Sequence, residues 1–103
     1  MKIMQGDSYP IPVDIMQDGV VVTPEMVEDV EITVGAEIRK LYSAGDITFE
    51  NNTWYFLLKQ QDTFSMSGNN AVVCRLKYPA TGYTHGVRVG YLSATEIDQK
   101  VVL

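Results

Sequence analysis

Hydrophobic and polar side chains alternate along several short stretches of this chain, which is the pattern of half-buried β-strands. Near the start, Ile11, Val13 and Ile15 alternate with more polar positions. Past the middle, Trp54 and Phe56 lead a run whose alternate residues are large and apolar, and the run ends at a polar corner, residues 60–63. Both stretches are therefore expected to be strands with one face in a hydrophobic core.

Turn residues separate the alternating stretches at short intervals. Pairs such as Asp18-Gly19 and Asn51-Asn52 supply the positive φ angles that tight hairpins need, so consecutive strands are expected to be antiparallel neighbours. The expected strands are residues 3–5, 11–17, 20–22, 30–34, 38–42, 47–49, 53–59, 71–78, 85–92 and 97–103. Short strands with regular turns predict a single all-β domain over residues 1–103, built as a two-layer sandwich or a small barrel.

One segment also fits a helix. Thr23 followed by Pro24 is typical of a helix start, and apolar residues recur at helical spacing as far as Tyr42. Against a long helix stand Gly35 in mid-run and the β-branched residues of positions 30–34. We expect a single helical turn over residues 24–27 and then a strand, with the helix as the alternative.

The alternation also predicts which side chains form the core. Cys74, the only cysteine, lies within an apolar alternation and is interpreted as a small buried hydrophobe; no disulfide can form within the chain. The expected core residues are Ile11, Val13, Ile15, Val30, Ile32, Trp54, Phe56, Leu58, Val72, Cys74, Leu76, Val87 and Val89.

Charge excludes some partners. The chain has 8 Lys and Arg against 13 Asp and Glu, a net charge of −5, so a nucleic acid or an anionic membrane would be repelled on average. We expect neither as a partner. The acidic residues with a local excess, Glu25, Glu28, Asp29, Glu31 and Glu37, are interpreted as a solvated face. Neither a signal peptide nor a membrane-spanning run is apparent, which predicts a soluble product made in the cytoplasm.

Catalytic and ligand-binding motifs are not apparent. His85 is the only histidine and has no nucleophile beside it in the sequence, so we expect a surface or turn histidine. One cysteine and one histidine do not make a metal site, and no glycine-rich phosphate loop occurs. The sequence therefore predicts no enzyme, no cofactor, no metal and no catalytic residue.

Exposed aromatic residues are the remaining candidates for function. Tyr55 and Leu57 lie on the face of their strand opposite to Trp54, where a single sandwich has no core for them. Together with Tyr83 and Tyr91 they form the candidate interface. Core packing explains most of the aromatic residues, but sugar stacking on exposed tyrosines stays open as an alternative.

Several phrases resemble a family of small bacteriophage and prophage proteins from Gram-positive hosts. The resemblance covers nearly the whole chain. The phrases are Gly6-Asp7-Ser8-Tyr9-Pro10, Thr23-Pro24-Glu25-Met26-Val27, Asp29-Val30-Glu31-Ile32-Thr33-Val34-Gly35, Ile38-Arg39-Lys40-Leu41-Tyr42, Gln60-Gln61-Asp62-Thr63-Phe64 and Lys100-Val101-Val102-Leu103. One departure is Arg75-Leu76-Lys77-Tyr78-Pro79, where the family often continues with a glutamine-rich or basic phrase.

The resemblance implies an immunoglobulin-like β-sandwich, similar to the N-terminal domain of phage baseplate upper proteins. It implies a virion component made in the bacterial host cytoplasm, a non-enzymatic structural or assembly module of the tail or baseplate. Its partners would be other phage structural proteins, with a homo-oligomer as a further option. The alternative is a module that binds a host-surface glycan through exposed tyrosines.

Overall fold

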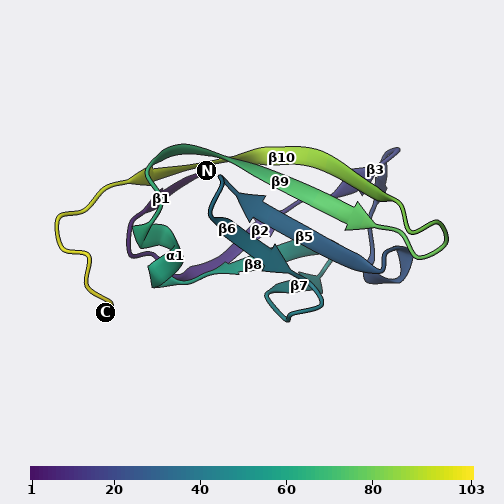
Figure 1. Ribbon diagram of the computed structural model, residues 1–103, viewed down its shortest axis with the longest axis horizontal. Coiled ribbons are helices and arrows are strands. Elements are labelled where there is room, and N and C mark those ends of the chain that lie inside the picture. Colours follow the sequence, from purple (N-terminus) through teal and green to yellow (C-terminus); the bar gives the residue numbers. More distant parts are fainter.

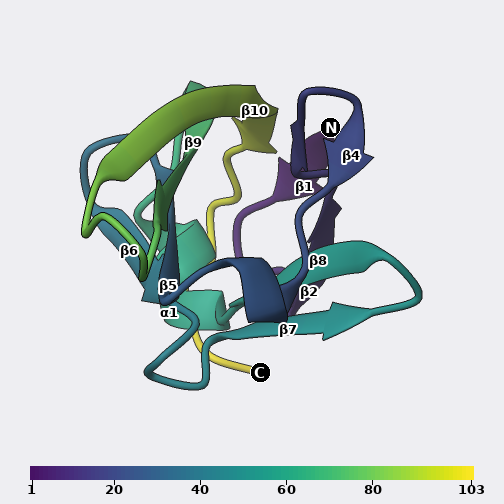
Figure 2. The same cartoon turned by 90° about the vertical axis from the view of Figure 1, so that its right-hand side faces the viewer.

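Two β-sheets pack face to face in the computed structural model, which describes residues 1–103 (Figure 1). The five-stranded sheet has the order β1 (Lys2–Met4), β10 (Thr84–Thr95), β9 (Gly68–Lys77), β5 (Asp29–Val34) and β6 (Ile38–Leu41). The three-stranded sheet has the order β2 (Tyr9–Val13), β8 (Thr53–Leu58) and β7 (Ile47–Glu50). A small hairpin of β3 (Met16–Gln17) and β4 (Val20–Val21) stands apart from both sheets (Figure 2).

The strand order is that of an immunoglobulin-like sandwich, which confirms the expected fold. In chain order β2, β5, β7, β8, β9 and β10 take the places of strands B, C, D, E, F and G, and β6 extends the sheet beside β5. Antibody domains join strands B and F by a disulfide. Here Cys74 lies on β9, in the place of strand F, and its thiol is free and buried.

The first and last strands pair with each other at one side of the larger sheet. β1 pairs with β10 in parallel, with Lys2 opposite Ser93 and Met4 opposite Thr95. β2 then continues in the other sheet, so the chain crosses between the layers within residues 5–8. All other strand pairings are antiparallel. β1 therefore covers only the C-terminal end of β10.

The expected single helical turn is present as a short 3-10 helix, η1 (Pro24–Met26), and a strand follows it. The β-branched run of β5 thus outweighs the helical spacing of the apolar residues. The expected polar corner after β8 is instead a one-turn α-helix, α1 (Gln60–Phe64). A carboxylate oxygen of Asp62 accepts the backbone N–H of Lys59 at 2.9 Å, which caps this turn.

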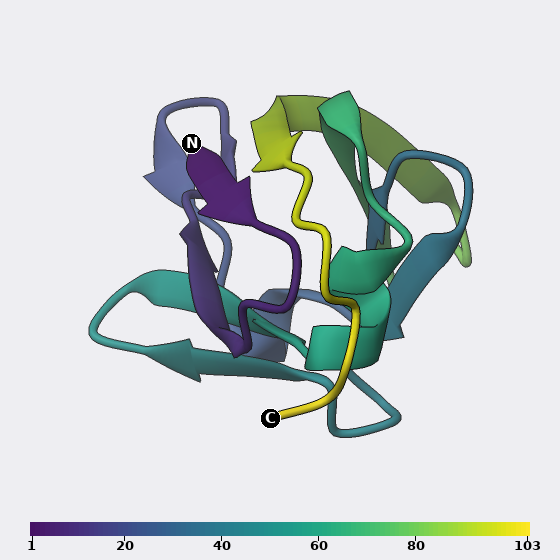
Figure 3. The ribbon, with the colours of Figure 1, turned by 90° about the vertical axis from the view of Figure 1, so that its left-hand side faces the viewer.

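Two expected strands differ in the structure. Residues 11–17 do not form one strand, because the chain leaves β2 after Val13 and restarts as β3. Residues 97–103 carry no regular structure and pass beside α1 (Figure 3). The backbone N–H of Ile97 donates to the side chain of Gln5 at 3.1 Å, and that of Leu103 donates to the side chain of Gln60 at 2.9 Å.

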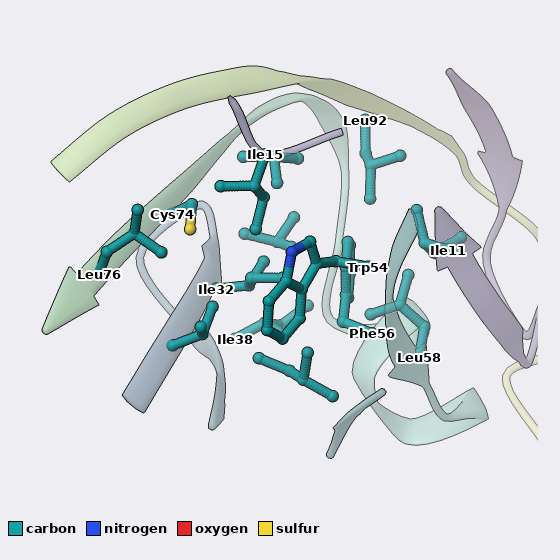
Figure 4. Close-up of a cluster of buried hydrophobic side chains, with 14 of the residues drawn as sticks. Ile11, Ile15, Ile32, Ile38, Trp54, Phe56, Leu58, Cys74, Leu76 and Leu92 are labelled. Carbon is teal, nitrogen blue, oxygen red and sulfur yellow. The ribbon is translucent and has the colours of Figure 1, made fainter. Parts of the chain in front are cut away.

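One core holds the two sheets together, made of 19 buried hydrophobic side chains from both layers. Trp54 lies at its centre, among side chains from the opposite sheet (Figure 4). Its ring lies 5.5 Å from the Tyr42 ring at 81° and 4.9 Å from the Phe49 ring. Edge-to-face and tilted pairs of this kind suit the charge distribution of aromatic rings.

Most expected core residues are buried in the structure: Ile11, Ile15, Val30, Ile32, Trp54, Phe56, Leu58, Val72, Cys74 and Leu76. Val13 and Val89 are half-buried and pack against the core. The expectation that Val87 belongs to the core is wrong. Its side chain is 38% exposed, although its register partner Cys74 is buried. At Val87, β10 is the outermost strand of its sheet, since β1 does not extend that far.

Candidate functional site

The outer face of the three-stranded sheet carries a small apolar patch. The cross-strand register places Pro10 beside Leu57 and Pro12 beside Tyr55. Leu57 is 40% exposed, both prolines are exposed and Tyr55 is half-buried. Because residues alternate between faces along a strand, these four side chains lie on the face opposite to Ile11 and the core. We call them the proline patch.

The same prolines determine what the edge of this sheet can bind. The backbone N–H of Leu57 donates to the carbonyl of Asp46 at 3.1 Å, on the β7 side. Phe56, the next residue along β8, therefore directs its backbone groups toward β2, where Ile11 is its partner. Pro10 and Pro12 alternate with Ile11, so their backbone groups point outward, away from β8. Proline has no N–H, so neither outward position of the β2 edge offers a hydrogen-bond donor. The proline patch is therefore available for face contacts, and pairing at its edge is blocked.

The structure does not bring the four candidate interface residues together. Tyr55 and Leu57 share the proline patch. Tyr83 lies in the loop between β9 and β10 and is 73% exposed. Tyr91 lies on the outer face of the other sheet, where Arg88 donates to its hydroxyl at 2.9 Å and stacks over its ring. The candidate interface is therefore three separate surfaces.

An arginine-rich surface covers the outer face of the five-stranded sheet. Glu31 of β5 bonds to Arg39 of β6 at 2.5 Å and to Arg75 of β9 at 2.5 and 2.6 Å. Arg88 of β10 lies on the same face, so all three arginines of the chain are here. The register places Arg75 directly opposite Glu31, with Arg39 opposite Thr33 on the other neighbouring strand. A planar guanidinium on each side matches the two carboxylate oxygens.

The expectation that Glu31 belongs to a solvated acidic face is wrong. Its side chain is 7% exposed because the two arginine side chains cover it, and these are themselves more than half exposed. Hydrogen bonds from Arg75 lower the pKa of the Glu31 carboxyl to about 2; burial opposes the shift, and the Arg39 hydrogen bond adds to it. Glu31 is thus a stable carboxylate that holds two cations in place, and its charge is matched within the sheet.

A shallow cleft lies where β10 begins. It has a volume of about 530 Å³ and is lined by Gln17, Tyr78, Ala80, Thr81, Tyr83, Thr84 and His85. The hydroxyl of Tyr78 donates to the side-chain oxygen of Gln17, which ties the β3–β4 hairpin to the end of β9. We call this the tyrosine cleft. It combines aromatic walls with hydroxyl, amide and imidazole groups, a composition that suits a polar ligand with an apolar face.

Buried polar groups at the other end of the molecule have structural partners. Thr63 accepts the backbone N–H of Gly6 at 2.8 Å and donates to the carbonyl of Asp7 at 2.9 Å. The side chain of Gln5 donates to the carbonyl of Met66 at 2.7 Å. Together these bonds fasten the crossover between β1 and β2 to α1. No buried side-chain nitrogen or oxygen lacks a partner, so none is poised for a ligand.

The single cysteine and the single histidine of the chain lie apart, one in the core and one at the surface. No three His, Cys, Asp or Glu side chains form a group that could hold a metal ion. Burial raises the pKa of the Cys74 thiol to about 12, which keeps it protonated and unreactive. His85 is exposed, on the rim of the tyrosine cleft. The proline patch and the tyrosine cleft thus offer apolar and hydrogen-bonding contacts.

Sequence reasoning missed two features of these surfaces. The cluster of Glu31 with Arg39 and Arg75 depends on the register of three strands, and the residues are up to 44 positions apart. The alternation that placed Ile32 inside also placed Glu31 outside, but it could not show that two arginines would cover it. The tyrosine cleft depends on where the β3–β4 hairpin lies. Of its lining residues, only Tyr83 belongs to the candidate interface expected from the sequence, and His85 was expected only to lie at the surface or in a turn.

Comparisons of the chain with protein-family models, with curated proteins and with solved structures gave no match. None of the helices is long and apolar enough to cross a membrane.

Proposed function

We propose that this chain is a non-enzymatic structural or assembly module of a phage or prophage virion, associated with the tail or baseplate, that acts through contacts with other virion proteins. The single observation that carries the proposal is the proline patch. It is a contiguous set of apolar side chains on the outer face of a sheet, where a sandwich on its own has no use for them. The phage context comes from the sequence resemblance.

The shape of the patch favours a protein partner over a small ligand. The patch lies on a sheet face, and the largest cleft of the molecule is elsewhere. The rest of the outer face is polar, including Thr48 opposite Tyr55 and Glu50 opposite Thr53. An apolar centre with a polar rim is the usual anatomy of a protein interface. Because the β2 edge has no outward N–H, the partner would pack on the face and not extend the sheet.

The test is genetic complementation in the strain that encodes the chain. Deletion of the gene is expected to remove assembled tails from the particles released after prophage induction, as seen by electron microscopy. The unaltered gene restores tails, and Leu57→Glu does not, because a buried carboxylate at the interface is costly. Met26→Glu is the matched control: Met26 is 39% exposed, as Leu57 is 40%, but lies on η1.

Normal tails from the deletion strain would overturn the proposal. Equal loss with Leu57→Glu and Met26→Glu would remove the proline patch as its basis. Circular dichroism of both purified variants shows beforehand that each is folded, so that a failure of assembly reports on the surface.

The tyrosine cleft supports a second candidate function, binding of a host-surface glycan. Tyr78 and Tyr83 can stack on the apolar face of a sugar ring, and Gln17 and His85 can bond to its hydroxyls. A glycan array with the purified chain tests this: binding lost in Tyr83→Ala and kept in Leu57→Glu would support it. Absence of binding to host cell-wall polysaccharides would contradict it.

A further inference from the structure

The N-terminal half of β10 is an open sheet edge. Of its 12 residues, only Ser93, Ala94 and Thr95 pair with β1. The N-terminal ammonium of Met1 reaches one step further, to the carbonyl of Tyr91. Residues 84–88 are all exposed, and no strand pairs with them on the side away from β9.

The backbone groups that this edge offers follow from the hydrogen bonds of β9. The carbonyl of Lys77 accepts the N–H of Glu28, on the β5 side of β9. Alternate residues of β9, counted from Lys77, therefore direct their backbone groups away from β10. Their register partners are Thr84, Gly86 and Arg88. In these non-hydrogen-bonded pairs, the backbone groups of the two residues point away from each other. The N–H and C=O groups of the three β10 residues therefore point to the open edge.

The other sheet edges are protected, and this one is not. The β2 edge carries Pro10 and Pro12 at its outward positions, and the edge strands β6 and β7 have only four residues each. Short edges and edge prolines are usual ways of preventing unwanted pairing. Residues 84–90 contain no proline and no acidic residue. The β3–β4 hairpin belongs to a separate sheet and does not pair with this edge, although Gln17 of the hairpin lines the tyrosine cleft together with Thr84 and His85.

A segment with the pattern of a strand lacks a partner strand in the same molecule. Residues 97–103 were expected to be a strand and carry no regular structure. Gln5 holds Ile97 and Gln60 holds Leu103, but between them Val101 and Val102 are 72% and 58% exposed. Val101 and Val102 are apolar and β-branched, so they favour an extended conformation on a sheet.

Residues 97–103 do not reach the open edge of their own molecule. This C-terminal segment and the loop between β9 and β10 lie at opposite ends of a molecule 48 Å long (Figure 1). Arg88 precedes Thr95 by about 23 Å of strand, and the path back along β10 is occupied by β1. Residues 98–103 extend at most about 20 Å. Any pairing between the two must therefore join different copies.

We propose that residues 98–103 of one copy add as an antiparallel strand to the open edge of β10 in a second copy. This goes beyond the proposed function, because it names a second copy of the chain as a partner and a contact separate from the proline patch. Antiparallel pairing with Asp98 opposite Arg88 sets a carboxylate beside the one cation of the edge. Lys100 then lies opposite Gly86 and Val102 opposite Thr84. Val101, on the other face, lies opposite His85. Such a contact is head-to-tail, so it builds a ring or an open series of copies.

Disulfide trapping tests the register. Gly86→Cys and Lys100→Cys are purified separately, mixed and oxidised. Residues directly opposite in a hydrogen-bonded antiparallel pair have Cα atoms about 5.5 Å apart, within the range that a disulfide spans. A Cβ at Gly86 would come within 3.4 Å of only a flexible arginine side chain, and Cys74 is buried and stays out of the reaction. The proposal predicts a mixed dimer in clear excess over either homodimer.

The control replaces Gly86→Cys by Glu50→Cys, an exposed position on β7. This mixture should give only the level of random collision. Cross-linking of Lys100→Cys to both partners equally would overturn the proposal. Homodimers of Gly86→Cys in excess would also overturn it, because they indicate that two β10 edges pair symmetrically.

Charge exchange provides a second readout that does not depend on cysteine. In sedimentation velocity at rising concentration, the unaltered chain is expected to associate, and Arg88→Glu and a deletion of residues 98–103 are expected to stay monomeric. Arg88→Glu combined with Asp98→Lys restores the opposite charges and should restore association. A double variant that stays monomeric while the unaltered chain associates would contradict the pairing.

The two proposals fail in different ways. Leu57→Glu leaves the β10 edge and residues 98–103 intact. It should therefore block assembly of phage tails without changing the amount of trapped dimer. If Leu57→Glu abolishes the dimer, the contact between copies lies at the proline patch and the strand-addition proposal is wrong. If the mixed disulfide dimer forms but phage tails assemble in the deletion strain, the virion role is wrong and the strand-addition proposal stands.

Discussion

The indole N–H of Trp54 donates to the carbonyl oxygen of Val22 across 2.8 Å, and both residues are completely buried. Val22 follows β4, so this bond fixes the end of the β3–β4 hairpin to the centre of the core. Val22 also donates its own N–H to the carbonyl of Ile15 at 2.9 Å. The long link between β2 and β5 is thus held by a side chain from β8.

Removing the Trp54 ring should destabilise the fold strongly. Trp54→Ala is expected to lower the free energy of unfolding by ~3–5 kcal/mol, because it leaves a cavity between the sheets. Trp54→Phe keeps much of the ring but leaves the Val22 carbonyl unpaired, at a cost of about 1–3 kcal/mol. Urea denaturation of the three proteins measures both effects. An unchanged midpoint for Trp54→Ala would show that the packing described here is wrong.

Stability should fall in acid through Glu31. Its folded pKa is about 2, against an ordinary value of 4.5. A carboxyl with a depressed folded pKa stabilises the fold above its unfolded pKa, and this contribution is lost as the pH falls from 4.5 toward 2. Glu31→Gln removes the contribution, on the order of 1–3 kcal/mol.

The measurement is denaturant unfolding of the unaltered chain and of Glu31→Gln across that pH range. The difference between the two proteins cancels the other carboxyl groups. We expect this difference to shrink as the pH falls. A difference that stays constant with pH would mean that the Glu31 carboxylate is not stabilised by its arginines.

Lys40 and Asp62 should respond unequally to substitution. Lys40 is buried on β6, and its ammonium lies 2.8 Å from the carboxylate of Asp62. Asp62→Asn leaves that ammonium buried without a counter-charge, which should cost about 3 kcal/mol. Lys40→Met should cost less, because the Asp62 side chain is 25% exposed and still accepts the backbone N–H of Lys59. Thermal or urea unfolding ranks the two variants. The reverse order would show that Lys40 is solvated in solution.

Cys74 should be inert in the folded protein. Its thiol is fully buried and its pKa is raised to about 12 by burial, with the nearby Glu31 carboxylate adding to the shift. Reaction with a thiol-specific chromogenic disulfide at neutral pH is expected only as fast as the chain unfolds, and at once in denaturant. Rapid reaction under native conditions would indicate that β9 opens locally.

The sequence predicts which side chains are buried where the alternation within a single strand decides it. The alternation around Ile32 and Phe56 placed both inside, and the Asn51-Asn52 pair adopts the positive φ angles, 50° and 63°, expected for a tight hairpin. Val87 failed because the alternation gives the face of a side chain and not whether a neighbouring strand, here β1, extends that far. Similarly, the β pattern of residues 97–103 gives a preference for strand but no partner to pair with.

The binding surfaces were less accessible to prediction because they are made of residues from different strands. Tyr55 and Leu57 were found from the alternation of a single strand. Their proline neighbours needed the register of β2 against β8. The sequence also did not reveal that Lys40 is buried, since a lysine at an inward position depends on Asp62 of α1, 22 residues away.

The parallel pairing of Lys2–Met4 with Ser93–Thr95 sets the order of events during synthesis. The first strand emerges from the ribosome long before its partner, so the larger sheet closes only after translation has passed residue 95. Pairing at such sequence separation gives a high contact order, and all-β domains of this kind fold in milliseconds to seconds. Until β1 pairs, the whole outer side of β10 is open; afterwards only its N-terminal half stays so.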